Sequence, residues 1–213
     1  MTTIAPTTSA PWLRIWTHPR VTIREQLARG SSAAVWIIPL FSGIAQTLVR
    51  VADRDLGLRA SAGMILVLAI PIGAIWGVVQ LYILAGLLYL VERANKGRAS
   101  FGQLRIALAW AAVPQVVVVA IWIIGTLLAG RFLYMDPDRA VASGAGWTVL
   151  TIAFTNLASA VCAIWWLVLS VFTVAEAQGG SAWRALGTMI LAALILGVVA
   201  LLAIVVVVAL SHP

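Results

Sequence analysis

Five long apolar stretches fill most of this chain, and nearly every charged residue lies in the short segments between them. The stretches cover about residues 33–49, 60–91, 104–129, 147–175 and 185–210. Only 10% of the residues are charged, whereas a soluble domain carries about 25%. So few polar groups cannot cover a surface in water, and each stretch reaches the roughly 17–25 residues with which a helix crosses a bilayer. The sequence therefore predicts an all-α fold, a polytopic transmembrane bundle of five helices over residues 33–210.

The N-terminal segment differs from the rest because polar and basic residues are frequent in it. Residues 1–10 are rich in Thr, Ser, Ala and Pro, a composition that is typical of disorder. Within residues 11–32, Thr22 and Glu25 have the spacing of a capping box, which predicts that a short helix begins at Thr22. Two tryptophans in this segment suit the headgroup layer of a membrane. We therefore expect a short interfacial helix on the cytoplasmic side or, alternatively, a basic anchor without a partner.

The basic residues divide unequally between the two sides of a five-span bundle. A cytoplasmic N-terminus places nine of them inside: Arg14, Arg20, Arg24, Arg29, Arg93, Lys96, Arg98, Arg105 and Arg184. The far side then holds five: Arg50, Arg54, Arg59, Arg131 and Arg139. The positive-inside rule therefore favours a cytoplasmic N-terminus and, with five spans, a C-terminus on the far side. The pattern of a cleaved signal peptide is missing, so we expect residues 33–49 to act as the insertion signal.

Three of the predicted spans contain a proline: Pro39, Pro71 and Pro114. The stretch of residues 60–91 is longer than a crossing helix needs, so we expect a kink or a break near Pro71, which has no N–H. Gly73 and Gly77 follow with the spacing G-x-x-x-G, which lets a second helix approach closely. We interpret this pair as a packing contact within the bundle.

The span over residues 147–175 carries a stripe of small, weakly polar side chains, with Asn156 beside it. The members of the stripe recur at spacings of three and four: Thr148, Thr151, Thr155, Ser159 and Cys162. Such a stripe lines a polar cavity or, in the interpretation that we favour, allows close packing and hydrogen bonds between helices. Three glutamines inside other spans are interpreted as similar interhelical groups: Gln46, Gln80 and Gln115.

No charged residue lies near the middle of a predicted span, which argues against a proton relay or an ion-coupled pump. The two histidines, His18 and His212, lie near opposite ends of the chain and on opposite predicted sides, so they cannot share a metal ion. Asp136 and Asp138 are interpreted as a solvated turn rather than a cation site. We therefore expect no metal, no cofactor and no catalytic residue. The basic residues form no single dense patch, which argues against nucleic-acid binding.

The segment between the second and third spans reads ERANKGRASFGQL, residues 92–104, and an apolar helix with a proline follows it. This arrangement resembles the Lys-Gly-x-x-Ser-Phe connection of the bacterial branch of the Yip1 family. The matching residues are Lys96, Gly97, Ser100, Phe101, Gln103, Leu104 and Pro114. Residues 18–24, HPRVTIR, are similar to the family's N-terminal segment, and residues 176–185 are similar to its last connection.

The resemblance extends over residues 16–210 and implies a five-helix integral membrane protein with a cytoplasmic N-terminus. The Asp-Leu-x-Gly-Pro segment of the eukaryotic members has only a loose counterpart here, residues 84–87. Binding of Rab GTPases and a role in vesicle traffic are therefore not carried over. Thirteen arginines against one lysine are typical of a GC-rich bacterium. Together these points predict the cytoplasmic (inner) membrane of a bacterium as the location.

The predicted function is that of a non-enzymatic scaffold or membrane-organising protein of the Yip1 type. Eight basic residues form its candidate binding surface for anionic lipid, for a membrane-protein partner or for a second copy: Arg14, Arg20, Arg24, Arg29, Arg93, Lys96, Arg98 and Arg105. The alternative is a small-solute transporter or channel that uses proline-broken helices and the polar stripe. The candidates for helix packing or for lining a cavity are Thr148, Thr151, Thr155, Ser159, Pro71, Gly73, Gly77 and Pro114.

Overall fold

Helices make up the regular structure of residues 10–30, 32–142 and 146–211, which are the residues that the computed structural model describes. The elements are α1 (Pro11–Thr17), α2 (Pro19–Arg29), α3 (Ala34–Asp53), the 3₁₀ helix η1 (Leu56–Leu58), α4 (Ala62–Ala94), α5 (Phe101–Ala111), α6 (Val113–Ala129), the 3₁₀ helix η2 (Gly130–Tyr134), α7 (Pro137–Ala142), α8 (Gly146–Ala177) and α9 (Ala182–Ser211). The predicted disorder of residues 1–10 falls, except for Ala10, outside the described residues.

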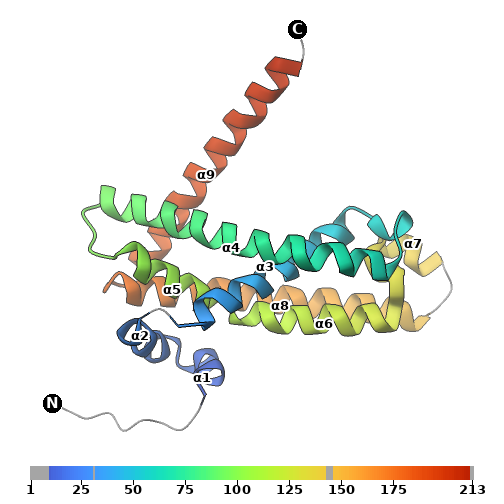
Figure 1. The fold of residues 1–213 in the computed structure, drawn as a ribbon, viewed down its shortest axis with the longest axis horizontal. Coiled ribbons are helices and arrows are strands. Elements are labelled where there is room, and N and C mark those ends of the chain that lie inside the picture. Colours follow the sequence, from blue (N-terminus) through green and yellow to red (C-terminus); the bar gives the residue numbers. More distant parts are fainter. Residues whose placement is uncertain (1–9, 31, 143–145, 212–213) are drawn as a thin grey trace.

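Five helical segments are long and apolar enough to cross a membrane: α3, α4, the segment Phe101–Tyr134 that comprises α5, α6 and η2, α8 and α9. This finding confirms the predicted all-α fold with five transmembrane helices, and the protein is a multi-pass membrane protein. In lipid, backbone N–H and C=O groups have no partners other than each other, so apolar runs of this length form helices. Figure 1 shows α3, α4, α6 and α8 running along one another as a bundle.

The N-terminal segment forms two short helices instead of one. Pro11 and Pro19 each occupy the first turn of a helix, where the missing N–H costs nothing. The predicted helix start at Thr22 is therefore wrong: Thr22 lies inside α2, and its hydroxyl donates to the carbonyl oxygen of His18 at 2.9 Å. Ile15 and Ile23 are fully buried, so the apolar side of this pair of helices packs on the bundle.

The prolines act differently in the three spans that contain them. Helices α3 and α4 continue through Pro39 and Pro71, so the break considered near Pro71 does not occur. The third span is interrupted instead, at Ala112, between α5 and α6. Pro114 then lies in the first turn of α6, where no N–H is needed.

Helices α3 and α4 cross at three glycines, Gly43 on α3 and Gly73 and Gly77 on α4. A Cβ atom on Gly73 would lie 2.6 Å from the Cα atom of Ile44, and one on Gly77 would collide with the carbonyl oxygen of Pro39. The two backbones are therefore in direct contact. Because lipid tails are as apolar as the helices, close packing of this kind is a main source of attraction between transmembrane helices.

The last helix, α9, packs on α4 and α8 only near its start and then leaves the bundle (Figure 1). Its buried residues, Ala185, Thr188 and Ala192, all lie in its N-terminal part. Residues 194–210 are exposed and consist largely of Leu, Ile and Val. In a bilayer, lipid covers this apolar surface.

The buried apolar residues of the bundle form two clusters, one toward each end. The first cluster includes Ile23 of α2 and Leu169 of α8, and the second includes Leu48 of α3 and Trp122 of α6. Helices α1 and α2 thereby become part of the core at one end of the molecule, where α4 and α8 also end (Figure 1).

Candidate functional site

Two ion pairs connect elements that are distant in the sequence at the end of the bundle where α2 packs. Arg24 donates to Glu176 at 2.6 Å and links α2 to the end of α8. Arg184 donates to Glu92 at 3.2 Å and links the start of α9 to the end of α4. The Glu92 side chain is 1% exposed, so its charge is placed in a site of low polarity and depends on this arginine.

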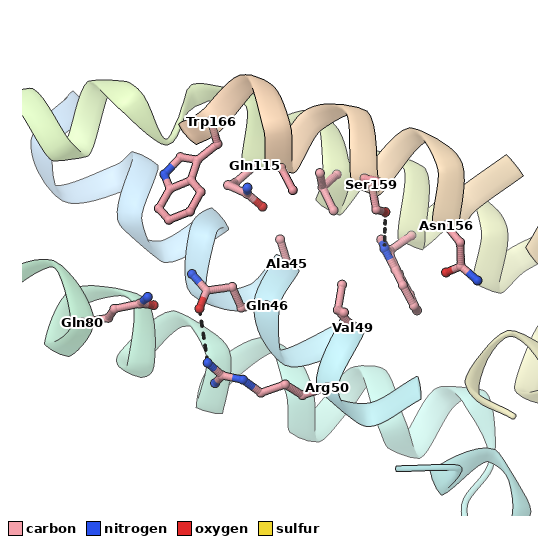
Figure 2. Close-up of a pocket in the computed structure, with 13 residues that line it drawn as sticks. Ala45, Gln46, Val49, Arg50, Gln80, Gln115, Asn156, Ser159 and Trp166 are labelled. Carbon is pink, nitrogen blue, oxygen red and sulfur yellow. Dashed lines mark hydrogen bonds between the residues drawn. The ribbon is translucent and has the colours of Figure 1, made fainter. Parts of the chain in front are cut away.

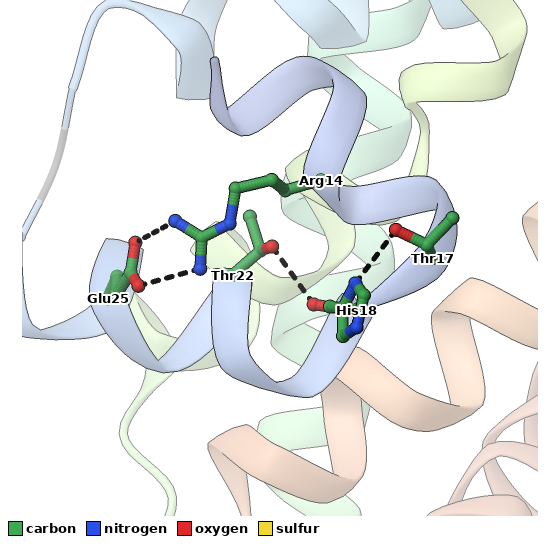
Figure 3. Close-up of polar contacts among 5 residues, drawn as sticks. All are labelled: Arg14, Thr17, His18, Thr22 and Glu25. Atoms are coloured by element: carbon green, nitrogen blue, oxygen red, sulfur yellow. Dashed lines mark hydrogen bonds and ion pairs between the residues drawn. The ribbon is translucent and has the colours of Figure 1, made fainter. Parts of the chain in front are cut away.

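A third ion pair closes the N-terminal helices on each other (Figure 3). Arg14 of α1 donates two hydrogen bonds to Glu25 of α2, at 2.9 and 3.1 Å. The hydrogen bonds from Arg14 hold the pKa of the Glu25 carboxyl below its usual 4.5, with a smaller contribution from the charge of Arg29. The hydrogen bond to Glu176 and the charge of that carboxylate raise the pKa of Arg24.

Aromatic rings contact three further arginines of this end. The guanidinium of Arg20 lies 5.5 Å from the ring centre of Phe172, and that of Arg93 lies 5.7 Å from Tyr89. Arg105 donates to the hydroxyl of Tyr82 at 2.9 Å, and the ring centres of Tyr82 and Trp36 lie 5.5 and 5.3 Å from its guanidinium. The Arg105 side chain is therefore partly buried and contacts protein groups, whereas the side chains of Arg20 and Arg93 are exposed.

The three carboxylates of this end are all used in ion pairs, and basic residues still remain. Five of those are exposed and form no ion pair with a described carboxylate: Arg20, Arg29, Arg93, Lys96 and Arg98. We call these five residues the basic face. The opposite end is nearly neutral, because five basic residues stand against four acidic ones: Asp53, Asp55, Asp136 and Asp138.

The connection from α4 to α5 has a defined backbone structure. Lys96 adopts a left-handed conformation with φ of 54°, and the N–H groups of Lys96 and Gly97 donate to the carbonyl oxygens of Arg93 and Glu92. This is a Schellman motif. Gly97 packs so closely on Glu92 that a Cβ atom at Gly97 would collide with the carboxylate. The motif thus presents Lys96 and Arg98 outward while Glu92 stays buried.

A capping box fixes the start of α5, directly after this connection. The Ser100 hydroxyl accepts from the Gln103 N–H at 3.3 Å, and the Gln103 side chain accepts from the Ser100 N–H at 2.9 Å. The Ser100 and Gln103 of the recognised connection therefore have a local structural role.

A cavity of about 470 Å³ lies farther along the bundle, between the α3–α4 pair and the α6–α8 pair (Figure 2). Small-molecule sites in proteins have volumes of roughly 300–1,000 Å³ and mainly apolar walls. Most of the residues around this cavity are likewise apolar. Its polar residues are Gln46, Arg50, Gln80, Gln115, Asn156 and Ser159.

The polar stripe of α8 divides between packing and the cavity. Thr148 and Thr155 are each 1% exposed and belong to the packed interior. Ser159 lines the cavity, accepts a hydrogen bond from Nε1 of Trp122 at 3.0 Å and donates to the carbonyl oxygen of Thr155 (Figure 2). The Thr151 hydroxyl donates to a carbonyl of its own helix.

Arg50, Trp122 and Trp166 also line the cavity, and none of them was predicted to do so. A signal for Arg50 was available, since it follows Gln46 by four residues and so lies on the same face of α3. The two tryptophans gave no such signal, because aromatic residues inside apolar helices are ordinarily packing residues.

Within the described residues, no group of three or more His, Cys, Asp or Glu side chains could hold a metal ion, and His212 lies outside these residues. The Asp136 carboxylate accepts from the Asp138 N–H at 2.9 Å, and the Asp136 N–H donates to the Asp55 carboxylate at 2.7 Å. Arg139 forms an ion pair with the same Asp55 at 2.8 Å. Asp55 is therefore the centre of a polar cluster at the nearly neutral end.

Comparison with protein families matches residues 13–204 to the Yip1 domain. Comparison with curated proteins gives no match, and neither does comparison with solved structures. The matched region includes α2 to α8 entirely and most of α1 and α9. The chain therefore belongs to the Yip1 domain family.

Proposed function

We propose that this protein is a non-enzymatic scaffold of the bacterial cytoplasmic membrane, and that its basic face binds anionic lipid headgroups. One observation carries the proposal. At this end of the bundle each carboxylate already has an arginine partner, and five exposed cations are left over. Anionic headgroups are the counter-charges that such a surface meets in a membrane.

The electrostatics favour this orientation and this ligand. With the N-terminus in the cytoplasm, the basic face lies against the inner leaflet, whose anionic lipids attract basic side chains by about 1 kcal/mol each. Apolar side chains at the same end can insert beside the headgroups: Leu13 is 71% exposed and Trp183 is 82% exposed. Bound lipid, or a membrane-protein partner with an acidic cytoplasmic segment, would satisfy the same five cations.

The test is a comparison of two triple variants of the full-length protein by native mass spectrometry from a mild detergent. The first, Arg29→Gln/Lys96→Gln/Arg98→Gln, removes three cations of the basic face. The second is a matched control at the opposite end: Arg54→Gln/Arg59→Gln/Arg131→Gln. Phosphatidylglycerol and phosphatidylcholine are offered in equal amounts.

We expect the wild type and the control variant to retain phosphatidylglycerol in preference to phosphatidylcholine, and the first variant to lose most of this preference. Raised salt should reduce the preference as well, since exposed charges are screened over about 8 Å at physiological ionic strength. Equal retention of the two lipids by the wild type would contradict the proposal, as would an equal loss in both variants.

The alternative function, solute transport through proline-broken helices, has less support. Helices α3 and α4 are continuous through Pro39 and Pro71, and only the third span is interrupted. A mobile pathway built from several broken helices would need more such interruptions.

A further inference from the structure

The cavity between α3, α4, α6 and α8 contains amide groups that the described residues leave unpaired. The Gln115 side chain is 9% exposed, lines the cavity and forms no hydrogen bond with a described residue. Oε1 of Gln80 is buried and also lacks a partner within the described chain. Buried polar atoms normally have hydrogen-bond partners, because an unpaired one costs about 1–3 kcal/mol. The buried oxygen of Gln80 and the unpaired amide of Gln115 line the same cavity and therefore indicate a polar ligand.

The interruption of the third span lies next to this cavity. Ala112, where α5 ends and α6 begins, lines a smaller adjoining cavity that shares Gln46 and Gln80 with the larger one. The end of a helix leaves carbonyl groups without intrahelical partners. At membrane depth such irregular backbone is tolerated only where protein buries it or where it lines a cavity. Here the Ala112 carbonyl accepts from the Gln115 N–H at 2.9 Å, and the Ala109 carbonyl accepts from the Ala112 N–H at 3.2 Å. The interruption therefore shapes the wall of the site, and the amide side chains supply its hydrogen-bonding groups.

Arg50 gives the cavity a positive charge that no described carboxylate neutralises. Its guanidinium donates to Oε1 of Gln46 at 3.3 Å and lies 5.5 Å from the ring centre of Trp76. Figure 2 shows Gln46, Gln80 and Arg50 reaching the cavity from the α3–α4 side, opposite Gln115. A carboxylate or a phosphate beside Arg50 would form charge-assisted hydrogen bonds of the strong kind.

The walls of the cavity and its accessibility define the remainder of the ligand. Asn156, Ala160 and Ala163 of α8 line the cavity and are exposed, so it is open to the outside of the bundle. In a membrane, that outside is lipid. We infer that the cavity binds an anionic amphiphile, which enters from the bilayer, places its carboxylate or phosphate head at Arg50 and Gln46, and lays its apolar body along α8. Gln80 and Gln115 hydrogen-bond polar atoms next to the head.

Photolabelling tests this inference. The full-length protein is reconstituted in nanodiscs of phosphatidylcholine and labelled with oleate that carries a diazirine in its chain. All proteins carry Arg29→Gln/Lys96→Gln/Arg98→Gln, so that three of the five cations of the basic face do not contribute. Unlabelled oleate, oleoyl-lysophosphatidylglycerol and oleyl alcohol serve as competitors that differ in the head.

Two pairs of variants locate the site. Arg50→Gln removes the charge, and its matched control is Arg54→Gln, an exposed arginine one turn further on. Ala163→Phe fills the cavity, and its matched control is Ala153→Phe, an exposed alanine of the same helix that does not line the cavity. Circular dichroism and gel filtration verify that each variant is folded. If Ala163→Phe does not fold, Arg50→Gln still tests the inference, because residue 50 is exposed.

We expect the labelled residues to lie within 156–163 of α8. Labelling of Arg50→Gln should be ten- to hundredfold weaker, because charged hydrogen bonds contribute about 1.5–3 kcal/mol. Labelling of Ala163→Phe should be lost. Both controls should label like the wild type. Competition by oleate alone would identify a free carboxylate as the ligand, and competition by the lysolipid a phosphate headgroup. The inference is overturned if oleyl alcohol competes as well as the anions, or if each variant labels like its control.

Discussion

Gly77 of α4 lies against Gly43 of α3 so closely that a Cβ atom on Gly77 would come within 2.8 Å of the Gly43 backbone nitrogen. No side chain fits there without separating the two helices. We therefore expect Gly77→Ala to lower the free energy of unfolding by about 1–3 kcal/mol, the usual cost of overpacking a core. Unfolding in a mixed micelle with increasing sodium dodecyl sulfate, followed by circular dichroism, measures this change.

Gly63→Ala is the matched control, because Gly63 belongs to the same helix and has open space around it. There the added methyl group should be neutral or stabilising, since alanine is the better helix former. If the two variants lose the same stability, direct backbone contact between α3 and α4 is not what the glycine provides.

Gly97 has a comparable role in the connection after α4, where Glu92 occupies the space of its missing side chain. We expect Gly97→Ala to displace the Glu92 carboxylate from Arg184 and to destabilise the protein by about 1–3 kcal/mol. Gly102→Ala, at a glycine whose Cβ atom would meet only the Ser100 hydroxyl at 4.0 Å, should change little.

A double-mutant cycle tests the cause of this effect. In a chain that already carries Glu92→Ala, the Gly97→Ala change should cost less, because the carboxylate it collides with is absent. The same unfolding assay applies. A cost that is independent of residue 92 would show that the collision is not the reason for glycine at position 97.

The pKa of Glu25 gives a prediction about pH. Because the hydrogen bonds from Arg14 lower the pKa of this carboxyl below 4.5 in the folded protein, the ion pair contributes its full stability above about pH 4.5. That contribution is lost as the pH falls through the lowered pKa. A carbon-13 NMR titration of labelled glutamate should therefore give a midpoint below 4.5 for Glu25.

The matched variants for this titration are Arg14→Gln and Arg98→Gln. The first should raise the Glu25 midpoint toward 4.5, and the second should leave it unchanged. A midpoint that is unmoved by Arg14→Gln would show that the pair in Figure 3 does not control this carboxyl.

The membrane fold was predictable from the sequence, since an apolar run of this length forms a helix in lipid whatever its neighbours are. The effect of the prolines was not. Pro71 costs one hydrogen bond, but the helix around it is held by the contact of Gly73 and Gly77 with α3, which depends on tertiary packing. At Pro114 the span is interrupted, and no local feature distinguishes this proline from Pro71.

For the candidate site, charge patterning indicated which end is basic but not which cations remain available. Arg24 and Glu176 are 152 residues apart, and Glu92 and Arg184 are 92 apart, so only the fold shows that they pair. The cavity could not be predicted from the sequence either. Its polar side chains come from four helices, and periodicity within one helix cannot show where the faces of several helices meet.

The orientation of the protein decides whether the basic face meets the cytoplasmic leaflet, and cysteine labelling measures it directly. The chain has a single cysteine, so Cys162→Ala provides a cysteine-free background. Ala28→Cys marks the end of the basic face, and Arg59→Cys marks the opposite end; both positions are exposed. A membrane-impermeant maleimide added to sealed cells, with the outer membrane permeabilised, should label Arg59→Cys at once and Ala28→Cys only after the cytoplasmic membrane is opened. Labelling of Ala28→Cys in sealed cells, with Arg59→Cys protected, would contradict the account.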